Sequence, residues 1–213
     1  MKDQYTFIFA GRSGCGKGTQ AKLLKEYLKS QDSNLALFEY STGDGFRKFI
    51  EGDSYSSNLA RDIQNKGELQ PLFLTISMWA SAFRDGLKPE DNIFIDGYPR
   101  VEAEAVAVVS ALKFYERKTP IIIDFKVSRE SSKERMEKRG RSDDTPENIE
   151  KRLNWYDRDV DIVDRMLAVI ICQRINLTYD VALRKKFLYS KNIRMYIQLV
   201  IFLLYHQYYL LIH

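Results

Sequence analysis

Cysteine and histidine are scarce in this chain, with two residues of each among 213. Cys15 and Cys172 lie far apart, and His206 and His213 lie near the C-terminal end. This spacing predicts neither a disulfide framework nor a metal-ligand cluster, so we expect no structural metal and a reducing, cytoplasmic location. The first residues reach a glycine loop at Gly11 without an apolar stretch of signal-peptide length, so we expect no cleavage at this end.

An excess of charge is also missing from most of the chain. The net charge of +4 comes from residues 179–213, which hold five basic residues and one acidic residue, and the remainder is formally neutral. A neutral body gives no basic surface for nucleic acid, and we expect no nucleic-acid partner. With 45% hydrophobic and 13% aromatic residues, the composition excludes intrinsic disorder and collagen.

Short apolar runs typical of strands alternate with helical patterns in the first two thirds of the chain. The runs lie at residues 5–10, 35–40, 92–96 and 120–127. This alternation predicts an α/β fold with a parallel sheet flanked by helices. Residues 44–86 contain no strand-like run, only helical patterns broken at Gly52 and Gly67, which predicts a helical insertion. Apolar residues spaced by four and three from Pro146 to Leu167 predict one amphipathic helix or two in succession.

A glycine-rich loop, Gly11-Arg-Ser-Gly-Cys-Gly-Lys17, directly follows the first predicted strand and precedes a helical pattern. Four residues separate Gly11 from the Gly16-Lys17 pair, which is the spacing of a P-loop. Glycines let backbone amides surround phosphate oxygens, and the lysine reaches the β and γ phosphates. The expected fold is therefore of the P-loop NTPase type. The hydroxyl that usually follows the lysine is displaced by one position, since Gly18 precedes Thr19.

The run Gly-Lys-Gly-Thr-Gln that starts at Gly16 resembles the nucleoside monophosphate kinases of the adenylate kinase type. Segments 41–47, 66–71 and 95–100 resemble the same family in the same order, and the last, Ile-Asp-Gly-Tyr-Pro-Arg, is its most specific signature after the P-loop. Segment 139–144 and Arg152 resemble the short lid and the arginine on the helix that follows it. Independently of the family, Arg135 and Arg139 lie four residues apart on a helical pattern and share one face.

The resemblance implies transfer of the γ-phosphoryl group of MgATP to a nucleoside monophosphate, with AMP as the preferred acceptor and Mg²⁺ as the cofactor. Its ATP site would contain Gly14, Cys15, Gly16, Lys17, Gly18, Thr19, Arg135 and Arg139. Its monophosphate site would contain Thr42, Arg47, Glu68, Leu69, Gln70, Gly97, Arg100, Glu104, Arg141 and Arg152. The residues that stabilise the transferring group would be Lys17, Arg139, Arg141 and Arg152. Asp96 would hold Mg²⁺ through water.

The implied organisation is a kinase core over residues 1–167 and a divergent C-terminal region over 168–213. Within the core, the monophosphate-binding insertion would span about 41–86 and the lid about 139–146. The lid places one residue between Arg139 and Arg141 and contains no cysteine for zinc.

One departure from the family concerns the acceptor base. Where adenylate kinases resemble one another in a glutamine that reads adenine, this chain has Glu104. A carboxylate only accepts hydrogen bonds, so Glu104 suits guanine better than adenine and predicts a relaxed or shifted base choice. In the alternative interpretation, Arg100 and Glu104 pair with each other at i and i+4 on a helix. The acceptor base therefore stays open between AMP, placed first, and GMP, CMP, UMP or dTMP.

The C-terminal region is the largest departure, because no glycine follows Gly140. We expect a last strand at 168–172 and a helix at 177–187. Residues 195–212 carry no charge, which admits a membrane anchor, a packing helix or a non-native extension, and of these an anchor is the least favoured. The rival function is a nucleotide-binding protein without turnover, since the border of the ATP adenine is not evident. The expected state is a monomer.

Overall fold

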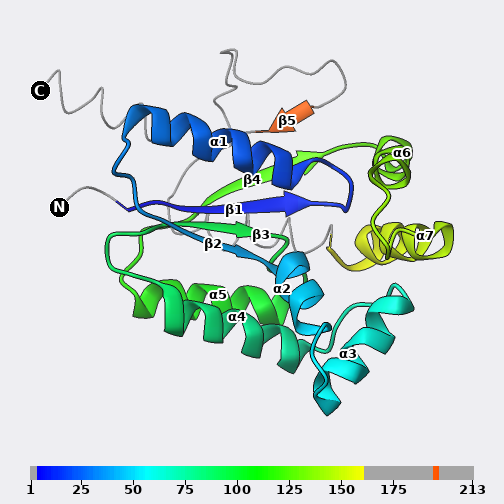
Figure 1. Cartoon of the computed structure of the whole chain (residues 1–213). Helices are drawn as coiled ribbons and strands as arrows, with labels where there is room; N and C mark the ends of the chain where they lie inside the picture. Colours follow the sequence, from blue (N-terminus) through cyan, green and yellow to red (C-terminus); the bar gives the residue numbers. More distant parts are fainter. Residues whose placement is uncertain (1–3, 161–193, 197–213) are drawn as a thin grey trace, which may run out of the picture.

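A computed structural model of the chain describes residues 4–160 and 194–196. Its centre is a five-stranded sheet in the order β2-β3-β1-β4-β5 (Figure 1). The strands are β1 (Thr6–Gly11), β2 (Leu37–Ser41), β3 (Asn92–Asp96), β4 (Ile121–Lys126) and β5 (Arg194–Tyr196). The first four are parallel, as predicted, and β5 adds an antiparallel edge beside β4. The strand order brings the carboxyl ends of β1 and β3 together, with Phe9 opposite Asp96.

The strands are apolar on both faces because helices cover both faces of the sheet. Helix α1 (Lys17–Gln31) covers one face, while α4 (Leu72–Gly86) and α5 (Glu102–Phe114) cover the other (Figure 1). On the α1 side, Phe9 and Phe125 pack in a cluster that also contains Leu24 of α1. On the opposite side, Ile95 packs with Trp79 of α4. The hydrophobic clusters on the two faces of the sheet therefore hold the strands in place between the helices.

The predicted insertion between the second and third strands consists of helices. These are α2 (Thr42–Phe49), α3 (Tyr55–Asn65) and α4, with the chain breaks predicted near Gly52 and Gly67. Ser41 and Ser54 begin α2 and α3 by accepting hydrogen bonds from backbone N–H groups three residues later, a strong N-cap signal. Helix α3 projects beyond the sheet toward α7 in Figure 1.

Two helices follow β4, namely α6 (Arg129–Arg139) and α7 (Pro146–Trp155). Gly140 ends α6 in the left-handed conformation with φ 60°. The amphipathic pattern predicted from Pro146 continues past α7 as a short π-helix, η1 (Tyr156–Val160). Met136 of α6 packs with Ile149 and Leu153 of α7, all fully buried. This contact fixes the two helices that flank the segment 139–146.

Most of the C-terminal predictions, including the strand at 168–172 and the helix at 177–187, lie outside the described residues. Of the uncharged stretch 195–212, only residues 195 and 196 are described, and they belong to β5 and not to a helix. Within residues 4–160 and 194–196, no helix combines the length and the apolar character that a membrane crossing requires.

Candidate active site

The glycine loop between β1 and α1 folds tightly around the ammonium group of Lys17. Gly11, Gly14 and Gly16 all have positive φ values, of 128°, 79° and 99°. The Lys17 ammonium donates to the carbonyl oxygens of Gly11 at 2.6 Å and Arg12 at 2.9 Å. Gly16 caps α1 and offers no side-chain acceptor to the first N–H groups of that helix. The loop thus presents a cation and a helix N-terminus together, an arrangement that favours anions.

Neighbouring residues of the predicted ATP site divide between the core and the surface. The Cys15 side chain is fully buried in the core cluster beside β1, so the predicted contact of this residue with ATP would be made by its backbone. The Cys15 carbonyl accepts a hydrogen bond from Arg135 Nη1 at 3.1 Å. Gly18 and Thr19 lie exposed in the first turn of α1. Arg135 is thereby positioned against the phosphate loop.

Asp96 ends β3 beside the phosphate loop. Its Oδ1 atom is buried and has no hydrogen-bond partner within the described part of the chain. A Cβ atom placed on Gly18 would lie 3.6 Å from Asp96 Oδ2, which shows how close the first turn of α1 comes to this carboxylate. Burial raises the pKa of Asp96, and the positive charges of Lys17 and Arg100 oppose that rise. A buried acidic oxygen without a partner is therefore surrounded by cations.

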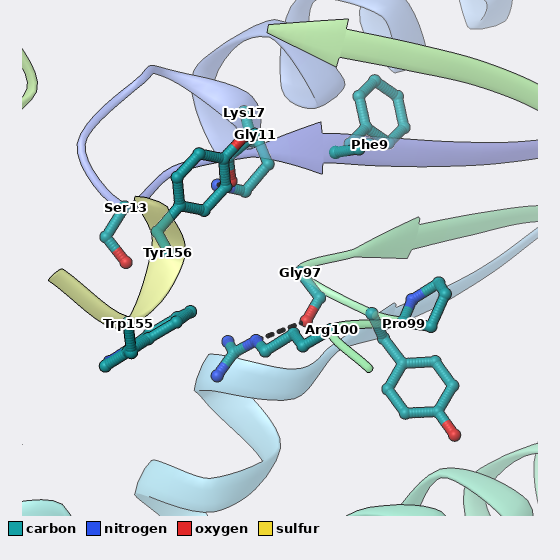
Figure 2. A pocket seen from close by; sticks show the side chains of 11 residues that line it. Phe9, Gly11, Ser13, Lys17, Gly97, Pro99, Arg100, Trp155 and Tyr156 are labelled. Carbon is teal, nitrogen blue, oxygen red and sulfur yellow. Dashed lines mark hydrogen bonds between the residues drawn. The ribbon is translucent and has the colours of Figure 1, made fainter. Parts of the chain in front are cut away.

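The signature that follows β3 turns sharply at Gly97, whose φ is 72°. The Nε atom of Arg100 donates to the Gly97 carbonyl at 2.8 Å (Figure 2). The negative charges of Glu104 and Asp96 and the positive charge of Arg152 act on the Arg100 guanidinium, whose pKa is lowered mainly by burial. Arg100 lines a cavity between the end of β1, the turn after β3 and the C-terminal end of α7.

Glu104 acts as a helix cap in this structure. Its Oε2 atom accepts a hydrogen bond from the backbone N–H of Arg100 at 2.6 Å, in the first turn of α5. Only 4% of the residue is exposed, and burial raises the pKa of Glu104 despite the hydrogen bonds from the backbone of Arg100 and Val101. In the alternative interpretation, the side chains of Arg100 and Glu104 pair with each other. In the structure Glu104 bonds to the backbone N–H of Arg100, whereas the Nε atom of Arg100 donates to the Gly97 carbonyl.

Arg139 at the end of α6 and Arg152 of α7 are held by two consecutive aspartates, Asp143 and Asp144. Arg139 forms a paired contact with Asp144 through Nε at 2.6 Å and Nη2 at 2.9 Å. Arg152 donates to Asp144 at 2.9 Å and also bonds to Asp143. Burial raises the pKa of Asp144, but the hydrogen bond from Arg139 and the charges of Arg139 and Arg152 outweigh burial and lower it. The buried carboxylate of Asp144 therefore links the last residue of α6 to Arg152 of α7.

Arg141 brings this segment close to the insertion. Its pKa is lowered by burial and then by the positive charges of Arg139 and Arg47. Arg47 lies on α2 and pairs with Asp44. Arg141 therefore lies near positive charge from the insertion, and its own positive charge also acts on Asp96.

The other residues predicted for the monophosphate site lie around the insertion. Thr42 is buried in the first turn of α2. Glu68, Leu69 and Gln70 form the loop between α3 and α4, where Gln70 Nε2 donates to the Ala60 carbonyl at 2.8 Å. This loop also meets α7, because Asn148 Nδ2 donates to the Asn65 carbonyl at 3.1 Å. The insertion and α7 are thus in direct contact.

Two aromatic residues that the sequence analysis did not select border the cleft. Trp155 and Tyr156 line a cavity together with Gly11, Lys17 and Arg100 (Figure 2). The Trp155 ring centre lies 5.6 Å from the Arg100 guanidinium carbon. Tyr156 lies 5.0 Å from the corresponding atom of Arg12. Their signal in the sequence was weak, because Tyr156 belongs to the apolar stripe of its helix whereas Trp155 falls outside that stripe.

A glycine loop between a strand and a helix, with a lysine in the loop and an acidic residue at the end of the adjacent parallel strand, characterises the P-loop phosphotransferases. The family model described as adenylate kinase matches residues 9–166. The chain is 35% identical over 159 residues to the adenylate kinase of Bifidobacterium longum (strain NCC 2705), which covers 71% of this chain and 80% of that protein. It is also 33% identical over 152 residues to the adenylate kinase of Mycobacterium leprae (strain Br4923), which covers 70% of this chain and 78% of that protein. The chain therefore belongs to the adenylate kinase family, whose members are phosphotransferases.

The candidate site has no cluster of metal-ligating side chains of its own. Within the described residues, no group of three or more histidine, cysteine, aspartate or glutamate side chains is arranged to hold a metal ion. Any divalent cation at Asp96 would therefore depend on water and on the phosphates of a bound nucleotide for its other ligands.

Proposed function

We propose that this protein transfers the γ-phosphoryl group of MgATP to a nucleoside monophosphate, with AMP as the preferred acceptor and two ADP molecules as the products. The observation that carries the proposal is the convergence of Lys17, Arg100 and Arg141 on Asp96, because positive charges from three separate segments oppose the rise that burial causes in the pKa of this one carboxylate. Phosphoryl transfer between nucleotides needs positive charge around both sets of phosphates and little covalent chemistry from the protein.

On the donor side, the proposal assigns the ATP phosphates to the backbone of the loop Gly14–Thr19 and to Lys17. The Lys17 ammonium is held on the loop by the carbonyl oxygens of Gly11 and Arg12 and by Cys15 Sγ, and a phosphate oxygen would replace one of these acceptors. Arg135, bonded to the Cys15 carbonyl, borders the adenosine side of ATP. Arg139 and Arg141 stabilise the charge that develops on the transferring group.

On the acceptor side, the insertion at about 41–86 would bind the monophosphate and the segment 139–146 would act as the lid. Arg47, Arg100 and Arg152 would bind the acceptor phosphate, with Thr42, the loop 68–70 and Gly97 near the nucleoside. AMP is placed first because the Glu104 carboxylate is engaged by backbone N–H groups and is not free to select guanine.

The residues present fit the magnesium ion that this chemistry requires. Asp96 Oδ1 is a buried acceptor without a partner in the described part of the chain, and a hard cation with several bound waters suits one carboxylate and substrate phosphates. When bound, Mg²⁺ neutralises charge on the phosphates. The protein's share is to present Asp96 at the end of β3, beside Lys17.

The proposal extends to a cytoplasmic monomer with ATP and a nucleoside monophosphate as its partners. Its rival is a nucleotide-binding protein without turnover. Binding of ATP is common to the two, and only turnover separates them.

The test is a coupled assay of ADP formation from MgATP with AMP, GMP, CMP, UMP and dTMP in turn, using the full chain. We expect turnover that is fastest with AMP and falls by about 100-fold or more in Lys17→Ala, the scale of losing one electrostatic contact to the transition state. Lys22→Ala is the matched control, because Lys22 lies on the exposed side of α1 and pairs with Glu26. No turnover with any monophosphate, despite ATP binding, would establish the rival.

A further inference from the structure

Trp155 occupies an unusual position for a large aromatic residue. It is the last residue of α7, and its ring faces the cleft that Lys17 and Gly97 also line (Figure 2). The buried face of α7 is formed by Ile149 and Leu153, which are fully buried, and continues at Tyr156. Trp155 is only partly buried and does not belong to that face. Packing of α7 therefore does not account for it.

The Trp155 ring lies against a charged group, the guanidinium of Arg100. The ring centre lies 5.6 Å from the guanidinium carbon, within the range of a cation–π contact, for which tryptophan is the best aromatic partner. On its other side, Arg100 is fixed by the Nε bond to the Gly97 carbonyl. The carbonyl and the indole face together leave the guanidinium few orientations.

The segment between α6 and α7 offers little material to cover this cleft. Gly140 alone separates Arg139 from Arg141, and the side chains of Arg139 and Arg152 are bound to Asp144. A cleft in which phosphoryl transfer occurs must exclude water, because hydrolysis competes with transfer. The nine-atom indole ring system of Trp155 lines this cleft beside Arg100 and so occupies space from which water must be excluded.

We propose that Trp155 is a positioning residue of the phosphoryl-transfer site: its indole ring orients the Arg100 guanidinium toward the acceptor phosphate and closes the adjoining part of the cleft to water. This inference rests on the proposed function, because it takes Arg100 as the ligand of the acceptor phosphate. Trp155 itself acts through Arg100 and not through a bond to substrate.

The test compares Trp155→Leu, which keeps apolar bulk but has no aromatic face, with Trp155→Phe, which keeps one. We expect Trp155→Leu to weaken AMP binding about 5-fold to 30-fold, measured by calorimetry on the full chain, and Trp155→Phe to stay within about 3-fold of the parent. Affinity for ATP should change by less than about 2-fold in both. Release of phosphate from ATP relative to transfer should rise in Trp155→Leu. Phe114→Leu, at an exposed aromatic residue on α5, is the matched control.

A double-mutant cycle shows whether Trp155 acts through Arg100. In an Arg100→Gln background, Trp155→Leu should change AMP affinity by less than about 2-fold, because the partner of the ring is gone. An equally large effect in both backgrounds, or equal losses of AMP and ATP affinity, would overturn the proposal. A parent protein that binds AMP but does not turn over would refute the proposed function, while the calorimetric comparison would still judge Trp155.

A second measurement covers the case in which Trp155→Leu does not fold. The chain has two tryptophans, so Trp79→Phe leaves Trp155 as the sole indole. Saturating AMP should then change the emission of Trp155, because the charge on Arg100 is paired with phosphate beneath the ring. Adenosine, which has no phosphate, should leave the emission unchanged. An unchanged emission with AMP would overturn the proposal.

Discussion

Gly14 of the phosphate loop lies where a side chain has no room. Its φ is 79°, and a Cβ atom added there would lie 2.3 Å from the Ser132 carbonyl oxygen and 2.9 Å from Met136 Cγ, both on α6. The first contact is with backbone, which cannot rotate away. We therefore predict that Gly14→Ala destabilises the fold through both its backbone conformation and this overlap.

The magnitude follows from two separate costs. A left-handed conformation costs an alanine about 1–2 kcal/mol, and overpacking against fixed atoms adds about 1–3 kcal/mol, so Gly14→Ala should lower the free energy of unfolding by about 2–5 kcal/mol. Gly140 provides the matched control, because its φ is 60° and nothing lies within 4 Å of an added Cβ atom. Gly140→Ala should therefore lower the free energy of unfolding only by the cost of the backbone conformation, about 1–2 kcal/mol.

The assay is urea unfolding of the full chain, with the midpoint and the slope both reported so that changes in the unfolded state are recognised. The difference between the two variants isolates the overlap with Ser132. Equal losses in Gly14→Ala and Gly140→Ala, within about 0.5 kcal/mol, would refute the reasoning. In that case α6 would have moved away from the phosphate loop at little cost.

Three further predictions concern acidic residues of the site. Asp96→Asn should abolish most transfer yet leave the melting temperature at pH 7 unchanged or higher, because burial raises the pKa of Asp96 and its charge costs stability above that pKa; a lower melting temperature would contradict this. Glu104→Gln should leave the AMP-to-GMP rate ratio unchanged, since the side chain caps α5, and a changed ratio in the coupled assay would restore a role in base choice. Asp144→Asn should cost about 2–4 kcal/mol of unfolding free energy at pH 7. The lowered pKa of Asp144 gives stability above the unfolded pKa of about 3.9 that is lost as pH falls through the folded value, so the difference between the two proteins in urea unfolding should shrink as the pH falls below about 3.9.

Local signals in the sequence were sufficient for the elements that carry the site. The strand before Gly11 and the helix after Gly16 followed from periodicity and glycine spacing, and both are present. The breaks at Gly52 and Gly67 correctly divided the insertion into helices. Strand and helix positions and glycine breaks depend mainly on residues that are close in sequence, so they can be predicted from a single sequence.

Contacts between distant segments could not be predicted in the same way. Arg12 Nη2 bonds to Asp157 at 2.6 Å across 145 residues, and neither residue stood out by spacing. The sequence suggested two partners for Glu104, a nucleotide base and the Arg100 side chain. It did not indicate the hydrogen bond that Glu104 accepts from the backbone N–H of Arg100 before α5. Trp155 was overlooked because its contact with Arg100 depends on how the end of α7 lies against the loop that follows β3. Each of these needs the tertiary arrangement.

The effect on transfer of the aspartates that bind Arg139 and Arg152 cannot be predicted from charge alone. Asp144 accepts hydrogen bonds from Arg139 and Arg152, so counting charges predicts that Asp144→Asn would strengthen phosphate binding and speed transfer. A guanidinium has five N–H donors, however, and Arg152 donates one hydrogen bond to the aspartates from each of its two terminal nitrogens. The remaining donors can still reach a phosphate while the aspartates fix the orientation of the group. Since oriented donors contribute more to a transition state than mobile ones, Asp144→Asn should slow transfer although the site becomes more positive, and faster transfer would show that Asp144 merely neutralises the arginines.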